Sequence, residues 1–313
     1  MASRLLSVEN LRVQYGRFLA VDNISFALSG GDLLGLIGPN GAGKTTTLRA
    51  IAGLTPPSTG RIDVMGYDPG KHVTDFGRHL GFAPDGPQAY DTLTVEDFLR
   101  FIGRAYRVSR EMLEERIDHW LEALWLSEKR KAKVSSLSKG MRQRLTVART
   151  LLPDPHVILL DEPAGGLDPA GRIQFRRLLA SLRDQGKAII VSSHILADLA
   201  EYCTHIAIVE RGRFLSFGTV AQVAGAGGET RSNYRIGFAH RVGDLNQRLA
   251  MIGELNLISS DPEAIVVEWD TDRERAAELL AKLINAGLPV AEFRALRPDL
   301  EQAYLRSGIG QVD

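Results

Sequence analysis

The order of apolar and polar residues divides the first part of the chain into short strands. Apolar and polar residues alternate over Leu5–Tyr15 and again over Val21–Leu28, which predicts two paired antiparallel strands. The stretches Leu33–Ile37 and Ala188–Val191 are apolar throughout, which is typical of strands buried on both faces of a parallel sheet. We therefore expect an antiparallel β layer followed by a parallel core.

Further strands and a helical insert continue this pattern. The remaining predicted strands are Arg61–Met65, Leu80–Ala83, residues 156–160, and a closing hairpin of His205–Glu210 and Arg213–Phe217. Helical spacing predicts an insert over about residues 92–152, whose charged residues would form a solvated face. Its two apolar stripes are Val95, Phe98, Leu99, Ile102 and Tyr106, and then Met112, Ile117, Leu121 and Leu124.

A second domain is predicted after a glycine-rich stretch. Residues 225–232 have the composition of a flexible linker, so the predicted domains are residues 1–224 and 233–313. The patterns beyond the linker predict the order β-α-β-β-α-β and a final helix at Asp299–Leu305, which is a ferredoxin-like order. We interpret this small α+β domain as a cap or dimerisation module, with a regulatory domain that binds a small ligand as the alternative.

Composition limits the class of protein. The 313 residues are enough for two domains, and 38 basic residues balance 38 acidic ones, so no nucleic-acid partner is expected. The single cysteine, Cys203, fits a reducing compartment and is predicted to be a packed, inert thiol. No signal peptide is recognisable, and no apolar stretch approaches the roughly 18–20 residues that span a bilayer.

A glycine-rich loop after the strand Leu33–Ile37 carries the strongest chemical signal. Residues Gly38 to Thr45 read Gly-Pro-Asn-Gly-Ala-Gly-Lys-Thr, and a helical pattern follows at Thr46–Ala52. This spacing is that of a phosphate-binding P-loop, in which backbone N–H groups and the helix N-terminus surround the phosphates. Lys44 would add a full positive charge, and the Thr45 hydroxyl would be a ligand of Mg²⁺.

Polar residues also follow two other predicted strands. Asp161 and Glu162 end one apolar strand, and His194 follows another, so all three are expected at the carboxyl edge of the parallel sheet. Asp161 fits a carboxylate that holds Mg²⁺, and Glu162 fits a base for an attacking water. Ser138 is a good N-cap for a helix that ends near Leu152, and its first turn could face a second phosphate.

Taken together, these motifs resemble the nucleotide-binding subunit of an ATP-binding cassette (ABC) transporter. The resemblance covers roughly residues 5–224 and includes the motifs in the order of that family. They are the aromatic Tyr15, Walker A at Gly38–Thr45, the signature at Leu137–Met141, Walker B at Val157–Glu162, the D-loop at Gly166–Asp168 and the switch His194. The resemblance implies a P-loop NTPase fold of the α/β class and an ATPase that uses ATP and Mg²⁺.

The resemblance also assigns roles to individual residues. The residues that would bind ATP are Tyr15, Gly38, Asn40, Gly41, Ala42, Gly43, Lys44, Thr45, Thr46, Ser138, Gly140 and Asp168. The catalytic residues would be Lys44, Glu162 and His194, and the ligands of Mg²⁺ would be Thr45, Asp161 and Asp85. Two subunits, expected to be identical, would close around two ATP molecules and drive a separate transmembrane permease from the cytoplasmic face of the membrane.

Two positions depart from the usual family pattern. Asp85 stands where the family usually has glutamine, and Gln88 lies three residues out of register. The signature reads Leu-Ser-Lys-Gly-Met, so Met141 replaces a glutamine and Lys139 adds a positive charge. This signature resembles the exporter-type subfamily with separate permeases for drugs, antibiotics or polysaccharides. The alternative is a soluble, non-transport ABC ATPase that acts on DNA or the ribosome.

Overall fold

The computed structural model divides into two compact units, the first running to Phe217 and the second beginning at Gly218. It describes residues 3–86, 90–195, 199, 201–223, 231–250, 252, 255–270 and 273–296. The predicted linker lies almost entirely outside these residues, as does the helix predicted at Asp299–Leu305. The predicted domain boundaries therefore stay predictions.

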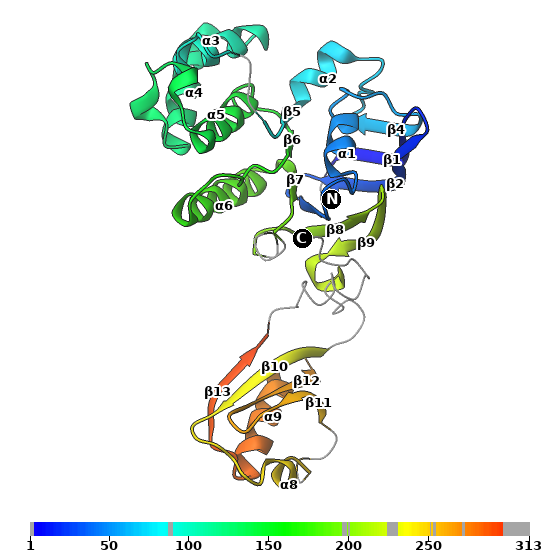
Figure 1. Cartoon of the computed structure of the whole chain (residues 1–313), viewed down its shortest axis with the longest axis vertical. Helices are drawn as coiled ribbons and strands as arrows, with labels where there is room; N and C mark the ends of the chain where they lie inside the picture. Colours follow the sequence, from blue (N-terminus) through cyan, green and yellow to red (C-terminus); the bar gives the residue numbers. More distant parts are fainter. Residues whose placement is uncertain are drawn as a thin grey trace. The chain divides into compact units, whose positions relative to one another are not determined.

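The first unit contains two sheets (Figure 1). The three-stranded antiparallel sheet has the order β2 (Phe18–Ser29), β1 (Arg4–Tyr15), β4 (Thr59–Val64). The six-stranded sheet has the order β5 (Leu80–Ala83), β6 (Val157–Leu160), β7 (Ala188–Ser193), β3 (Leu33–Ile37), β8 (His205–Glu210), β9 (Arg213–Thr219). Neighbouring strands pair in parallel from β5 through β6, β7 and β3 to β8. The predicted α/β core with its antiparallel layer is therefore confirmed.

Strand β3 was expected to be buried, and all five of its residues are. The same holds for β6, whose four residues are fully enclosed. Leu34 and Leu36 of β3 join the core that the central sheet shares with the antiparallel layer and with helix α1 (Lys44–Ile51). Cys203 is buried as predicted, and this burial raises the pKa of its thiol well above the usual value.

Helices surround the central sheet. They are α2 (Val73–His79), α3 (Val95–Ala105), α4 (Arg110–Ala123), α5 (Lys139–Leu151) and α6 (Pro169–Asp184), with short 3₁₀ turns η1 (Ser127–Lys129) and η2 (Val134–Ser136). In Figure 1, α3, α4 and α5 lie together beside β5 and form the predicted helical insert. No helix of the described residues is long and apolar enough to cross a membrane.

Two members of the predicted apolar stripes of the insert are not part of its core. Met112 and Tyr106 are exposed, whereas Leu113 and Leu124 are buried. The reason is the break between α3 and α4, where Arg107 adopts a positive φ of 58° and the helical spacing starts afresh at the cap residue Ser109. The segment with the helical pattern therefore contains two helices, α3 and α4, each with its own buried face.

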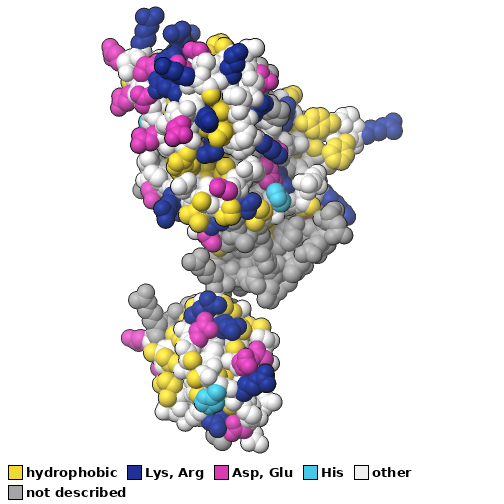
Figure 2. Space-filling model, turned by 60° about the vertical axis from the view of Figure 1, so that its left-hand side comes forward, with side chains coloured by type: hydrophobic (Ala, Val, Ile, Leu, Met, Phe, Trp, Pro, Cys, Tyr) yellow, Lys and Arg dark blue, Asp and Glu magenta, His cyan; other side chains and the backbone are white. Residues whose placement is uncertain are grey.

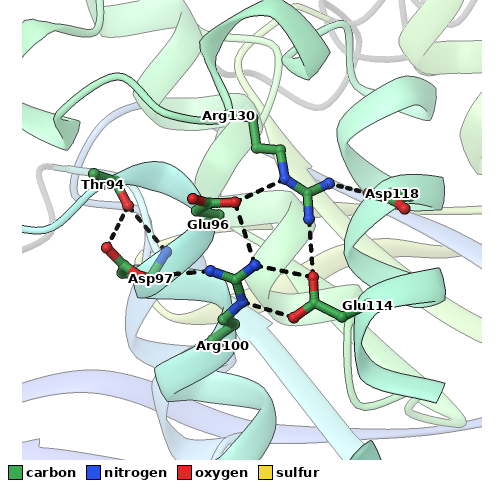
Figure 3. A network of polar contacts seen from close by, with 7 residues as sticks. All are labelled: Thr94, Glu96, Asp97, Arg100, Glu114, Asp118 and Arg130. Atoms are coloured by element: carbon green, nitrogen blue, oxygen red, sulfur yellow. Dashed lines mark hydrogen bonds and ion pairs between the residues drawn. The ribbon is translucent and has the colours of Figure 1, made fainter. Parts of the chain in front are cut away.

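Part of the charged face of the insert forms a connected network (Figure 3). The Arg100 guanidinium donates to both oxygens of the Glu114 carboxylate, at 2.6 and 3.1 Å, and also reaches Glu96. Arg130 donates to Glu96 at 2.8 Å, to Glu114 at 2.9 Å and to Asp118. The network ties α3 to α4 and to the segment after η1. Elsewhere, Figure 2 shows acidic and basic side chains interspersed over one face of this unit, as the balanced charge leads us to expect.

In the second unit, the described residues form a four-stranded antiparallel sheet and the helices that connect its strands. Its elements are β10 (Arg231–Phe238), α8 (Leu245–Ala250), β11 (Asn256–Ser260), β12 (Ala264–Asp270), α9 (Arg273–Asn285) and β13 (Val290–Ala295). The sheet order is β11-β12-β10-β13, which interleaves the two β-α-β halves and confirms the ferredoxin-like prediction. A separate core that includes Ile236, Val267, Leu279 and Leu283 holds this unit together.

Candidate nucleotide site

The glycine loop between β3 and α1 has a backbone that only glycine adopts easily. Gly41 and Gly43 have φ values of 81° and 107°, in the left-handed region. A side chain on Gly43 would also collide with the carbonyl oxygen of Ala20, 2.6 Å from the position of its Cβ. A side chain on Gly38 would meet the backbone of Val209. These contacts explain the glycines of the loop in physical terms.

Lys44 lies inside this loop and is buried. Its ammonium group donates to the carbonyl oxygens of Gly38 at 2.6 Å and of Pro39 at 3.2 Å. Burial lowers the pKa of Lys44, while the nearby charges of Glu162 and Asp161 act in the opposite direction. The side chain is therefore a positive charge held at the loop by the chain's own carbonyl groups.

Three strand ends meet beside Lys44. Strands β6, β7 and β3 are neighbours and run in parallel, so the residues that follow them share one edge of the sheet. Glu162, after β6, has a carboxylate oxygen 4.0 Å from Lys44 Nζ. The other oxygen, Oε2, lies 2.8 Å from Nδ1 of His194, which follows β7. The structure thus joins all three residues predicted to be catalytic.

Glu162 is held in an unusual conformation. Its φ is +45°, in the left-handed region, where a non-glycine residue costs of the order of 1–3 kcal/mol. The backbone N–H of Glu162 donates to the hydroxyl of Ser192 at 2.9 Å, and that hydroxyl donates to the Asp161 carboxylate at 2.6 Å. The buried Ser192 hydroxyl thereby links the Glu162 backbone to the Asp161 carboxylate.

Ser192 was not among the predicted site residues. It is the fifth residue of β7, in register with Leu36 of β3, and it is completely buried. The signal available in the sequence was a pair of hydroxyl residues, Ser192 and Ser193, at the end of an apolar strand and directly before His194. A buried hydroxyl needs a hydrogen-bond partner inside the protein, and here the partner is the site itself.

Two further residues predicted to bind ATP, Ser138 and Asp168, lie at helix N-termini. Ser138 caps α5 by accepting from the N–H of Met141 at 3.3 Å, and Asp168 caps α6 by accepting from the N–H of Gly171 at 2.8 Å. Gly140 packs so tightly on Gly166 that an added Cβ would lie 2.6 Å from the Gly166 carbonyl oxygen. Among the described residues, no hydrogen bond or ion pair joins Ser138 or Gly140 to the P-loop of the same chain.

Several of the remaining predicted residues are at the surface. Tyr15 ends β1, pairs with Phe18 across the turn, and is about half exposed, at 49%. Asn40, Thr45 and Asp85 are exposed, whereas Ala42 is buried. Gln88, the neighbouring candidate for the position of Asp85, lies outside the described residues. Surface exposure leaves Tyr15, Asn40, Thr45 and Asp85 open to a ligand.

Comparison with known proteins decides the family. Residues 21–165 match a family model described as "ABC transporter". A linearmycin resistance ATP-binding protein of Bacillus subtilis is 34% identical over 227 residues, which are 72% of this chain and 73% of that protein. The chain belongs to the ABC transporter family. The resemblance predicted from the motifs is thus confirmed.

Other relatives of this ABC protein agree. A Nod factor export ATP-binding protein of Ralstonia nicotianae is 38% identical over 68% of this chain and 67% of its own length. An ABC transporter ATP-binding protein of Synechocystis is 41% identical over 64% of this chain, and the match spans only 57% of that relative. A solved ATP-binding subunit of an ABC transporter superposes with a TM-score of 0.68 at 31% identity, covering 72% of this chain and 95% of the other.

The donor groups of this ABC protein are compatible with Mg²⁺. The available groups are the Asp161 carboxylate and the Thr45 hydroxyl, which are hard oxygen ligands of the kind that Mg²⁺ prefers. The described residues contain no group of three or more His, Cys, Asp or Glu side chains that would enclose a metal by themselves.

Proposed function

We propose that this chain is the ATP-hydrolysing subunit of an exporter whose membrane-spanning permease is a separate protein. The observation that carries the proposal is the connected set Lys44, Glu162 and His194 at the carboxyl edge of the sheet, directly beside the P-loop. A phosphate-binding loop beside a carboxylate and an imidazole in contact can bind the phosphates of a nucleotide and position an attacking water.

The P-loop residues Gly38–Thr46 would bind the phosphates of ATP. The N-terminus of α1 contributes about half a positive charge, and the loop N–H groups contribute donors. Lys44 would exchange its bonds to the Gly38 and Pro39 carbonyl groups for phosphate oxygens. The exposed ring of Tyr15 offers a face on which adenine would stack.

Glu162 would act on the attacking water. Its carboxylate would accept the proton as a general base, and the hydrogen bond to His194 fixes the direction of that carboxylate. His194 is exposed, so its ring would reach both the water and the terminal phosphate. Mg²⁺, held by Asp161 and Thr45 with Asp85 as a further candidate, would neutralise charge on the phosphates.

A second copy of the chain would complete each site. Ser138 and Gly140 lie on a helix N-terminus that faces no nucleotide loop of its own chain among the described residues, so they would contact ATP bound to the partner. Asp168, next to the Gly140–Gly166 contact, would couple the two sites. We therefore propose a homodimer that closes around two ATP molecules.

Export is supported by the names of the relatives, which include a Nod factor export protein and a linearmycin resistance protein. We infer that this chain binds its permease at the cytoplasmic face of the membrane. The test is a tagged pull-down of the full chain from native membranes in mild detergent, followed by mass spectrometry. A multi-span membrane protein in stoichiometric amount is expected, and a soluble complex with DNA or ribosomes would favour the non-transport alternative.

A further inference from the structure

A pair of histidines lies at the amino ends of two neighbouring strands, on the edge of the central sheet opposite the candidate nucleotide site. His79 ends α2 and directly precedes β5, and His156 directly precedes β6 (Figure 1). Strands β5 and β6 pair in parallel with Leu80 opposite Val157, so the two histidines are opposed one step before this pair. Their rings therefore lie beside each other.

The fold holds both histidines in place. The N–H of His156 donates to the carbonyl oxygen of His79 at 3.0 Å, and the carbonyl oxygen of His156 accepts from the N–H of Ala188 at 2.9 Å. The ring of Tyr67 stacks on the ring of His79, with centroids 5.1 Å apart and an angle of 15° between the planes. The two imidazoles are thus positioned by contacts within the chain, as a binding site requires.

The two rings face each other with one nitrogen each. Nδ1 of His79 lies 3.5 Å from Nδ1 of His156. This separation is long for a hydrogen bond, because N–H donors in proteins commonly approach their acceptors to about 2.7–3.2 Å. It is close to the separation of about 3.3–3.4 Å between two nitrogens that bind one tetrahedral Zn²⁺ at about 2.0–2.1 Å. A square-planar metal would need the two nitrogens about 2.9 Å apart.

The surroundings of the pair permit a cation to bind. Lys187, whose charge acts on His156, is itself paired, since its Nζ lies 2.5 Å from a carboxylate oxygen of Asp154. Burial, Lys187 and His79 lower the pKa of His156, so its ring is neutral near pH 7 and offers a lone pair. His156 is exposed and His79 is partly buried, which leaves the pair open to an ion from solution.

We propose that His79 and His156 form a two-histidine site for Zn²⁺, bound through both Nδ1 atoms, with water in the remaining positions. Imidazole nitrogens are ligands that Zn²⁺ accepts readily, whereas Mg²⁺ prefers oxygen. The ion would join the end of α2 to the start of β6 and so hold β5, the first strand of the sheet order, against its neighbour. Zinc binding here does not depend on ATP hydrolysis, because neither histidine belongs to the candidate nucleotide site.

Calorimetric titration of ZnCl₂ into the full chain, without nucleotide and without an affinity tag, measures the stoichiometry. One Zn²⁺ per chain is expected to bind at micromolar concentration, and millimolar Mg²⁺ should not displace it. His79→Gln and His156→Gln should each weaken binding at least tenfold, because a single imidazole loses the advantage of two linked ligands. His240→Gln, which changes an exposed histidine of the second unit, is the control and should bind Zn²⁺ like the wild type.

Nitrogen NMR of the imidazole rings identifies the atoms that bind. Zn²⁺ should shift the Nδ1 resonances of His79 and His156 together and leave those of His240 unchanged. Co²⁺ in place of Zn²⁺ should give the strong visible absorption of tetrahedral coordination. Rings that do not respond at millimolar Zn²⁺, or binding that neither glutamine variant weakens, would overturn the proposal.

Two further measurements separate zinc binding from folding and from the nucleotide site. Without metal, the His156→Gln chain should show a normal thermal transition and hydrolyse ATP like the wild type, and Zn²⁺ should raise the unfolding temperature of the wild type only. Lys44→Ala, which removes the ammonium group of the P-loop, should still bind Zn²⁺ like the wild type. Loss of Zn²⁺ binding in Lys44→Ala would assign the ion to the nucleotide site and overturn the proposal.

Discussion

At the scale of single residues, the site depends on a few side chains that hold one another in place. Glu162 contacts both Lys44 and His194, and its backbone is fixed by Ser192 in a left-handed conformation. A residue kept in a strained conformation by its neighbours is characteristic of a functional position. The first two predictions concern Glu162 and Ser192.

Glu162→Gln should bind ATP with unchanged affinity and lose hydrolysis. The amide is nearly isosteric but does not accept the proton of the attacking water, so we expect a fall in kcat of about 10²- to 10⁴-fold. Phosphate release and nucleotide binding measure the two effects, and gel filtration with MgATP should show a trapped dimer. Wild-type turnover in this variant would contradict the role of Glu162 as a base.

Ser192→Ala should destabilise the first unit and raise the Mg²⁺ concentration needed for hydrolysis. It leaves the buried Asp161 carboxylate and the Glu162 N–H without their shared partner, which costs about 1–3 kcal/mol in the free energy of unfolding. Ser193→Ala is the matched control, since the Ser193 hydroxyl only accepts from the N–H of Ile195 near the surface. Equal losses in the two variants would argue against a special role for Ser192.

At the scale of elements, polar networks decide how helices are held. The helical insert joins α3 and α4 through Arg100, Glu114 and Arg130, as Figure 3 shows. The pKa of Glu114 is lowered, chiefly by its hydrogen bond to Arg100. A lowered pKa in the folded state stabilises the protein above the pKa of the unfolded state, and this contribution disappears as the pH falls through the folded-state pKa.

Glu114→Gln should therefore lower the free energy of unfolding at pH 7 and change it little at pH 3. Because Glu114 is about half exposed, solvent screening limits the difference to about 0.2–1 kcal/mol. Urea unfolding of the wild type and the variant at both pH values measures it. Glu115→Gln, an exposed position on α4, is the control and should change little at either pH. A loss in Glu114→Gln that is the same at both pH values would contradict the assigned ion pairs.

At the scale of the whole molecule, each of the two units has a hydrophobic core of its own among the described residues. One core spans the central sheet and the antiparallel layer, and the other lies under the ferredoxin-like sheet. All predicted nucleotide-binding residues belong to the first unit, which ends at Phe217. The two units should therefore respond differently to a ligand.

Calorimetry of the full chain should show two unfolding transitions, of which only one shifts with MgATP. A ligand at 100 times its dissociation constant stabilises the unit that binds it by about 2.7 kcal/mol. Lys44→Ala, which removes the buried ammonium group of the P-loop, should abolish the shift while leaving the other transition in place. A shift of both transitions by the same amount would show that the units unfold together.

Much of the fold and of the site was predictable because its signals are local. The bounds of β3, β5 and β8 agree with the predicted strands residue for residue, since short apolar stretches flanked by turn residues mark them clearly. The predicted hairpin turn Arg211-Gly212 has positive φ at both residues, as a tight turn between antiparallel strands needs. The short helix α2 was not predicted, because seven residues carry too little periodicity.

The sequence by itself determined the motifs and their local backbone, because glycines with positive φ, helix caps and apolar strands depend on neighbouring residues. Only the tertiary structure decided which strand ends meet, and hence that Glu162 lies beside Lys44 and His194 and that Ser192 bonds to the Asp161 carboxylate and the Glu162 N–H. The physical reason is that strand order and side-chain burial depend on contacts between distant segments, which residue spacing does not encode.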